Sequence, residues 1–156
     1  MINSFKKIRI LIVDDHAILL MGLKETISET DDLLVVAEAR NGHEALEKIR
    51  STELDIIVLD IDMPGKSGWD VLMQLKSEGS MLPTLVLSSF SEDNHALAAI
   101  KAGASGYLNK NSAPELLVEA IRKVAGGGKF VTQKLAEKMV CEWDRDELAH
   151  QKLSPR

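Results

Sequence analysis

The sequence feature that most restricts the fold is an apolar run, Ile56 to Leu59, that ends abruptly in acidic residues. Four consecutive apolar residues, three of them β-branched, are typical of a strand that is buried on both faces of a sheet. Asp60 follows the run directly, and Met63-Pro64-Gly65 predicts a turn that ends the strand. Because ligands of open α/β sheets bind outside the carboxyl ends of the strands, we expect Asp60 to lie at a ligand-binding edge.

A strand-like apolar run followed by a helical pattern occurs five times along the chain. We expect strands at residues 8–13, 33–37, 55–60, 84–87 and 106–108, and helices at residues 19–27, 43–50, 68–77, 93–102 and 112–125. The last helix shows a start signal, with Ser112 as the expected N-cap and Pro114 in the first turn. This alternation predicts an α/β fold with a five-stranded parallel sheet and right-handed crossovers.

The composition is typical of a cytoplasmic protein with one main core. The chain has 156 residues and a net charge of −5, so its charge gives no indication of nucleic-acid binding. The single cysteine, Cys141, excludes an internal disulfide and a multi-cysteine zinc site. No apolar run approaches the roughly 18 residues of a membrane span, and Met1 to Lys7 lacks the apolar core of a signal peptide. We therefore expect no membrane partner.

A further helix is expected after the α/β region. Gly126 to Gly128 ends the fifth helix and predicts a break in the chain. Residues 132–151 then carry a helical pattern, with Leu135, Met139 and Trp143 on one face. This apolar stripe is too short to predict a coiled coil, and whether the helix packs back on the sheet or extends away from it stays open.

Chemically reactive side chains follow the ends of several predicted strands. They are Asp14 and Asp15 after the first strand, Asp60 after the third, Ser88 after the fourth and Lys110 near the end of the fifth. The carboxyl ends of parallel strands share one edge, so these side chains can converge there. Neighbouring carboxylates raise each other's pKa unless a cation neutralises them, and Mg²⁺ prefers such hard oxygen ligands.

This set of residues predicts a Mg²⁺-assisted phosphoryl acceptor. An aspartate such as Asp60 can attack phosphorus and form an aspartyl phosphate. Phosphoryl transfer then depends mainly on positioning and charge neutralisation, to which Lys110 can contribute a second cation. The Ser88 hydroxyl can donate a hydrogen bond to a phosphoryl oxygen.

The motifs together resemble the receiver domain of two-component response regulators. They are Val13-Asp14-Asp15, Leu59-Asp60-Ile61-Asp62-Met63-Pro64-Gly65, Leu87-Ser88-Ser89 and Tyr107-Leu108-Asn109-Lys110, and the intervals between them fit that family's usual spacing. The resemblance covers residues 8–125. It implies a flavodoxin-like, doubly wound sheet with strand order 2-1-3-4-5 and helices on both faces.

The resemblance also implies a role for each matched residue. Asp60 would accept a phosphoryl group from the phosphohistidine of a sensor histidine kinase. Asp15 and Asp60 would bind Mg²⁺ through their carboxylates, Asp14 directly or through a water molecule, and Asp62 through its backbone carbonyl. The catalytic hydroxyl and cation would be Ser88 and Lys110, and the two switch positions would be Ser88 and Tyr107. A phosphorylated chain of this family would form a homodimer.

Two residues would flank the path of water to the phosphoryl group. Asp62 and Phe90 lie two positions beyond the acceptor and the switch hydroxyl. The bulky Phe90 would obstruct that water, whereas Asp62 would orient it, and these two effects oppose each other. On the Phe90 argument we expect slow self-dephosphorylation. His16, which follows the two aspartates, is expected to be a surface residue.

The sub-family resemblance is to NarL/FixJ-type regulators, which carry a LuxR-type helix-turn-helix after a linker. It rests on Val13-Asp14-Asp15-His16, Gly103-Ala104-Ser105-Gly106-Tyr107-Leu108 and the three glycines at 126–128. Leu153-Ser154-Pro155-Arg156 resembles the beginning of that DNA-binding domain. We therefore expect a receiver domain at residues 1–128 and, at residues 129–156, a linker helix with a truncated start of the output domain. DNA binding would require the missing output domain.

Two other functions stay open at this point. Asp60-Ile61-Asp62 resembles the Asp-x-Asp motif of haloacid-dehalogenase-type phosphatases, although there the motif follows the first strand rather than the third. The chain could also be an α/β interaction module that is never phosphorylated. The presence of Asp14, Asp15, Asp60 and Lys110 together argues against that reading, and the chain is expected to be a signalling receiver rather than an enzyme.

Overall fold

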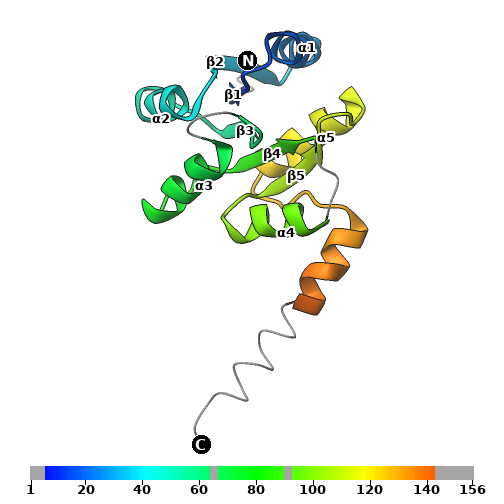
Figure 1. Ribbon diagram of the computed structural model, residues 1–156. Helices are drawn as coiled ribbons and strands as arrows, with labels where there is room; N and C mark the ends of the chain where they lie inside the picture. Colours follow the sequence, from blue (N-terminus) through cyan, green and yellow to red (C-terminus); the bar gives the residue numbers. More distant parts are fainter. Residues whose placement is uncertain (1–5, 64–66, 90–92, 143–156) are drawn as a thin grey trace, which may run out of the picture.

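The computed structural model describes residues 6–63, 67–89 and 93–142, with the backbone alone at residues 93 and 94. Five strands alternate with five helices in this part of the chain (Figure 1). The strands are β1 (Ile8–Val13), β2 (Leu33–Ala39), β3 (Ile56–Asp60), β4 (Thr84–Ser88) and β5 (Gly106–Asn109). The helices are α1 (Ala17–Ser28), α2 (Gly42–Ser51), α3 (Gly68–Ser77), α4 (Asp93–Lys101) and α5 (Pro114–Ala125).

The strands form one parallel sheet with the order β2-β1-β3-β4-β5. The predicted fold class and strand order are therefore confirmed. β3 lies at the centre of the sheet, and all five of its residues are buried. Val13 pairs with Leu59, while Asp60 pairs with Leu87. This register brings the ends of β1, β3 and β4 to the same edge of the sheet.

Two apolar layers cover the two faces of the sheet. On one face, Ile10, Ile12 and Val58 pack in the same cluster as the apolar residues of α1 and α5. On the other face, Leu11 and Leu59 belong to a cluster with the apolar residues of α2, α3 and α4. Successive strand residues point to opposite faces, so a strand flanked by helices on both sides requires an uninterrupted apolar run. The run that ends at Asp60 meets this requirement.

The observed start of α5 differs from the prediction. Its N-cap is Ala113, which has no side chain that can cap, whereas Ser112 was expected to fill that position. The backbone N–H of Ser112 instead bonds to the carbonyl of Asn109, which forms a turn directly after β5. Pro114 still occupies the first turn of the helix, where a missing N–H costs nothing.

The segment after α5 lies along the free edge of β5. The backbone N–H of Tyr107 donates to the Phe130 carbonyl at 3.1 Å, and the Phe130 N–H donates to Ser105 at 3.0 Å. A Cβ atom on Gly106 would approach the Phe130 carbonyl oxygen to 3.1 Å and Val124 to 3.1 Å. Glycine at position 106 therefore permits this close approach of the two segments.

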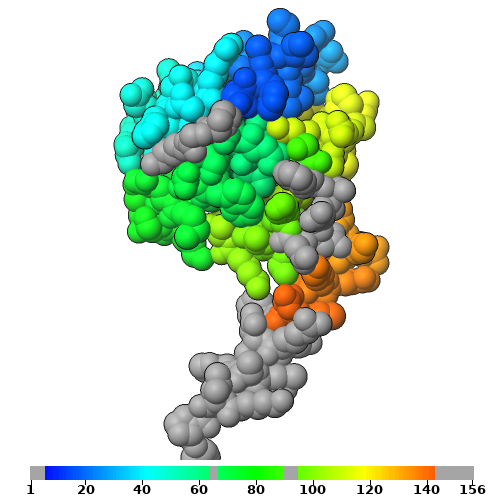
Figure 2. Space-filling view, viewed as in Figure 1, coloured from blue at the N-terminus to red at the C-terminus, as the bar shows by residue number. Residues whose placement is uncertain are grey.

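A helix follows at residues 133–142, and it packs against the domain. Leu135 is only 2% exposed and joins the core cluster that contains Tyr107, with Val131 and Met139 packed against it. Figure 1 shows this helix (orange) extending from the β5 end of the sheet, and in Figure 2 it lies far from α1 and β2. The rest of the helix predicted for residues 132–151, including Trp143, lies outside the described residues. Among those that are described, no helix is long and apolar enough to cross a membrane.

Candidate functional site

Asp60 is the most buried acidic residue at the sheet edge, with no exposed surface. The Lys110 ammonium lies 2.9 Å from Asp60 Oδ1, and the backbone N–H of Asp62 donates to the same oxygen at 2.8 Å. Lys110 is positioned by the end of the sheet, since its backbone N–H donates to the carbonyl of Ser88 at 2.9 Å. The predicted strand-end residues of β3, β4 and β5 are thus brought together.

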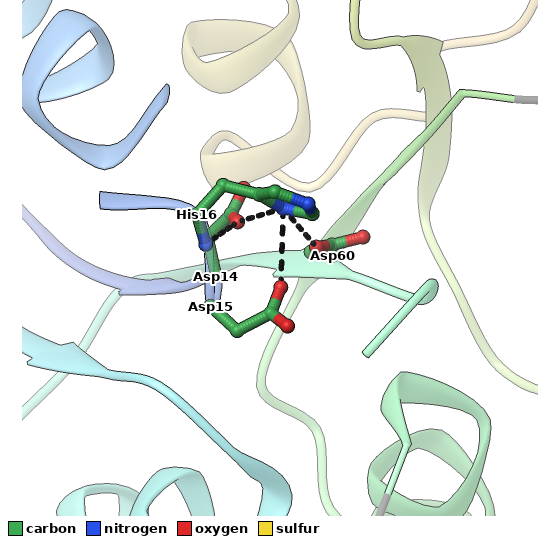
Figure 3. Close-up of side chains that lie close together, drawn as sticks. All are labelled: Asp14, Asp15, His16 and Asp60. Atoms are coloured by element: carbon green, nitrogen blue, oxygen red, sulfur yellow. Dashed lines mark hydrogen bonds and ion pairs between the residues drawn. The ribbon is translucent and has the colours of Figure 1, made fainter. Parts of the chain in front are cut away.

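Asp14, Asp15 and His16 come from the segment between β1 and α1 and face Asp60 (Figure 3). Asp14 is 1% exposed, and its Oδ1 accepts the backbone N–H of His16 at 2.8 Å. It is His16 that takes the N-cap position of α1, and no side chain caps that helix. The carboxylates are therefore not used as helix caps, which leaves them available to the site.

The His16 ring lies among three carboxylates. Its Nδ1 atom is 3.1 Å from Asp14 Oδ1, 3.1 Å from Asp15 Oδ1 and 3.8 Å from Asp60 Oδ2. The side chain of His16 is nevertheless 59% exposed. The expectation of a surface residue therefore holds for the outer side of the ring, but not for the side that faces the carboxylates. The sequence signal for the contact of His16 with the carboxylates was its position directly after Asp14 and Asp15.

The site holds more negative than positive charge. Burial raises the pKa of the Asp60 carboxyl above its ordinary value, and the Asp14 charge adds to this, while the Lys110 ammonium and the Asp62 N–H favour the ionised form. One ammonium faces three carboxylates. The arrangement therefore favours the binding of a further cation.

Three carboxylate oxygens at this site have no hydrogen-bond partner among the described residues. They are Asp14 Oδ2, Asp15 Oδ1 and Asp60 Oδ2, and all three are buried. Asp15 Oδ1 has the His16 ring at 3.1 Å. Buried polar atoms are usually satisfied, so Asp14 Oδ2 and Asp60 Oδ2 call for a ligand. The donors of Asp14, Asp15, His16 and Asp60 all lie within 4.8 Å of one another. Hard carboxylate oxygens at this spacing fit a divalent cation such as Mg²⁺.

The Asp62 carboxylate turns away from this cluster, toward the end of β4. Its Oδ2 accepts the backbone N–H of Ser89 at 3.0 Å, the Ser89 hydroxyl at 3.1 Å and the Ser88 hydroxyl at 3.4 Å. These contacts join two segments that are separated by 26 residues in the sequence. The side chain of Asp62 therefore holds the end of β4 at Ser88 and Ser89, a contact for which the sequence pattern gave no signal.

The start of α3 packs closely against the backbone that follows Asp60. A Cβ atom at Gly68 would lie 2.5 Å from the Asp60 carbonyl oxygen and 2.6 Å from the Ile61 Cα. Those atoms belong to the backbone and cannot move aside, so this position admits only glycine. The Ser67 hydroxyl caps α3 in a reciprocal pair with Asp70, which holds the helix start beside the site.

A sequence profile described as "Response regulator receiver domain" matches residues 10–122. The chain belongs to this receiver family. NarL, the nitrate/nitrite response regulator protein of Escherichia coli strain K12, is 36% identical over 81% of this chain and 58% of its own length. LnrK, a transcriptional regulatory protein of Bacillus subtilis strain 168, is 35% identical over 90% of this chain and 64% of its own length. The chain thus spans about 60% of the length of these relatives.

Solved receiver structures share the fold. A LuxR-family two-component response regulator from Aurantimonas sp. SI85-9A1 superposes with a TM-score of 0.79 at 33% identity, covering 88% of this chain and 98% of its own. The signal receiver domain of the putative NarL from Mycobacterium tuberculosis gives a TM-score of 0.74 at 32% identity, over 78% of this chain and 98% of its own. These likenesses confirm the NarL/LuxR-type resemblance, so the chain is a receiver of that type and belongs to a signalling family rather than a classical enzyme family.

Most of the predicted site residues of this receiver lie together at the sheet edge, and Tyr107 belongs to one of the two apolar layers. Tyr107 is 7% exposed and packs in the cluster that also contains Leu135. The predicted turn at Pro64 and Gly65 and the side chain of Phe90 lie outside the described residues. The expectation about slow self-dephosphorylation therefore stays a prediction.

Proposed function

We propose that this receiver is phosphorylated on Asp60 by a sensor histidine kinase. The observation that carries the proposal is the buried Asp60 carboxylate. It has Lys110 on one oxygen and, within the part of the chain that the structure describes, no hydrogen-bond partner on the other. In the transfer, a bond forms between an Asp60 oxygen and phosphorus. The bond between phosphorus and the histidine nitrogen breaks, and its electron pair returns to that nitrogen.

The other site residues assist this transfer by charge and position. Asp14, Asp15 and Asp60 would hold Mg²⁺ through their carboxylates, together with the backbone carbonyl of Asp62. When bound, the ion neutralises charge on the phosphoryl oxygens. Lys110, already within 2.9 Å of Asp60, contributes the second positive charge.

Phosphorylation would act as a switch through Ser88 and Tyr107. A phosphoryl group adds a charge of about −1.5 to −2, and it offers the Ser88 hydroxyl an acceptor that competes with the Asp62 carboxylate. Tyr107 lies on the next strand, in the same apolar cluster as Leu135 of the C-terminal helix. A shift of Ser88 would therefore change the packing of β5 and of the segment that follows.

The output of the switch would be transcriptional control. Relatives of this chain are named as transcriptional regulators, and they are longer than it is. We propose that residues 1–128 form the receiver and that residues 129–156 form the linker and the start of a DNA-binding output domain. Phosphorylation would promote a homodimer, and the full-length protein would bind DNA through that output domain.

The direct test is phosphorylation by acetyl phosphate with Mg²⁺, followed by intact mass spectrometry. The wild-type chain should gain one phosphoryl mass, while Asp60→Asn and a sample without divalent metal should gain none. Asp55→Asn is a matched control, because Asp55 directly precedes β3, at the end opposite to Asp60, and its carboxylate accepts the backbone N–H of Arg9 at 2.8 Å. Equal labelling of wild type and Asp60→Asn would disprove the proposal.

A further inference from the structure

His16 gives the acidic site a nitrogen donor that the proposed Mg²⁺ chemistry does not use. Its Nδ1 faces the carboxylates of Asp14, Asp15 and Asp60, while the outer side of the ring is open to solvent (Figure 3). Mg²⁺ favours oxygen ligands, whereas imidazole nitrogen suits late first-row metals such as Zn²⁺. The side chains at this edge are therefore a mixed nitrogen and oxygen donor set.

The spacing of the donors is that of ligands around one small ion. Four donors held about 2.0–2.1 Å from Zn²⁺ in a tetrahedron are separated from one another by roughly 3.3–3.4 Å. His16 Nδ1 is 3.1 Å from Asp14, 3.1 Å from Asp15 and 3.8 Å from Asp60. All four donors lie within 4.8 Å of one another, so side-chain rotation would draw them together around a single cation.

Burial and charge support the same conclusion. Asp14 and Asp60 are 1% and 0% exposed, and each has one buried oxygen that finds no hydrogen-bond partner among the described residues. Three carboxylates carry a charge of −3, against which Lys110 supplies +1. A divalent cation would bring this sum to zero beside the two buried carboxylates of Asp14 and Asp60.

We propose that His16 creates a second metal-bound state, in which a late first-row divalent cation of the Zn²⁺ class is held by four protein donors. The donors are His16 Nδ1 and one carboxylate oxygen each from Asp14, Asp15 and Asp60. Tetrahedral zinc sites with four protein ligands have no open coordination position. In this state Asp60 is a metal ligand, so the site is closed to a phosphoryl group and the receiver is held in its unphosphorylated form.

This inference rests on the proposed function only for its inhibitory consequence. The metal site itself is defined by His16 and the three aspartates, and it can be measured without any phosphoryl donor. Its test therefore has two independent parts, metal binding and the effect of zinc on phosphorylation.

The binding part uses Co²⁺ as the probe and Zn²⁺ as the competitor. Tetrahedral Co²⁺ absorbs visible light far more strongly than octahedral Co²⁺, so the spectrum reports the coordination directly. At pH 8 the wild-type chain should show the intense tetrahedral bands, and Zn²⁺ should abolish them. His16→Asn should lose these bands, while His43→Asn, which alters an exposed histidine on α2, should keep them.

The loss of affinity should be large. Removing an outer-shell partner of a metal ligand costs roughly 10- to 100-fold in affinity, and loss of a direct ligand should cost at least as much. Competition titrations should therefore show Zn²⁺ affinity falling by that factor in His16→Asn and staying unchanged in His43→Asn. A wild-type Co²⁺ spectrum of octahedral type, or equal Zn²⁺ affinity in wild type and His16→Asn, would overturn the proposal.

The functional part compares phosphorylation by acetyl phosphate and Mg²⁺ with and without equimolar Zn²⁺. For each variant the readout is the ratio of the two phosphorylated fractions. Zn²⁺ should sharply reduce this ratio for the wild-type chain and for His43→Asn, and far less for His16→Asn. Equal zinc sensitivity in all three proteins would contradict the closed four-donor state.

The two proposals fail in different ways. If the wild-type chain is not phosphorylated in Mg²⁺ without zinc, the proposed function fails, whatever the cobalt spectra show. If the wild-type chain is phosphorylated on Asp60 but its Co²⁺ spectrum is the same as that of His16→Asn, the metal inference alone fails.

Discussion

Docking of the C-terminal helix should depend on a single buried side chain, that of Leu135. Leu135 is 2% exposed and joins the cluster of Tyr107, whereas Val140 on the same helix is 62% exposed. Leu→Ala substitutions in cores cost about 2–5 kcal/mol, and the cost is lowest where the surroundings can collapse onto the cavity. The helix lies at the edge of the domain and can shift inward, so about 2 kcal/mol is the expected loss of docking free energy.

A loss of about 2 kcal/mol corresponds to an undocked population about 30 times larger. Hydrogen exchange measured by mass spectrometry or NMR should detect this change as faster exchange of the amides at residues 133–142. The Tyr107 amide should accelerate with them, because it donates to the carbonyl of Phe130 in the same segment. Val140→Ala is the matched control and should leave both signals unchanged.

Two results would refute this reasoning. If Leu135→Ala exchanges like Val140→Ala, the helix is not held by the buried leucine. If the helix amides accelerate but the Tyr107 amide does not, the pairing of Phe130 with β5 is independent of helix docking. In that case the helix could not transmit a change in the packing of Tyr107.

Three further predictions follow from other contacts. Gly106→Ala should lower the free energy of unfolding by about 1–3 kcal/mol in urea denaturation, because the new methyl group meets atoms at 3.0–3.1 Å. Asp62→Ala should speed exchange of the Ser89 amide about fivefold, since a hydrogen bond of about 1 kcal/mol is lost. Arg122→Gln should destabilise the chain at neutral pH and progressively less in acid. The two hydrogen bonds from Arg122, each of 2.8 Å, lower the pKa of Asp32 in the folded state. The ion pair therefore stabilises the fold fully above the ordinary aspartate pKa of about 3.9. This stabilisation is lost as the pH falls through the lowered pKa of Asp32 in the folded protein.

Each of these predictions has an internal control. Gly22→Ala adds the same methyl group in α1, where nothing lies within 4 Å, and should stabilise the chain by about 0.5–1 kcal/mol. Asp31→Ala removes an exposed aspartate and should leave Ser89 exchange unchanged. The stability difference caused by Arg122→Gln should shrink in high salt, which screens exposed ion pairs. A difference that is constant from neutral to acidic pH would show that the charge of Asp32 does not contribute.

Local sequence patterns were sufficient to predict the alternating strands and helices and the sheet edge to which Asp14, Asp60 and Lys110 converge, while the strand order came from the resemblance to receiver domains. The apolar run before Asp60 required a strand buried on both faces, and the strand-end position of Asp14, Ser88 and Lys110 placed their side chains at one edge. These inferences work because strand and helix periodicities are local properties and because parallel strands share an orientation. The capping of α5 was predicted wrongly, since Ser112 lies in a turn that depends on the carbonyl of Asn109.

The sequence by itself therefore determined the strand that carries Asp60 and the residues that gather around it. Only the tertiary structure decided that His16 faces three carboxylates, that Asp62 binds Ser88 and Ser89, and that Leu135 packs in the cluster of Tyr107. The physical reason is that periodicity shows which face of an element is apolar or charged, but not which surface that face meets. Such partners are distant in the sequence or depend on side-chain direction, and packing of the whole domain selects them.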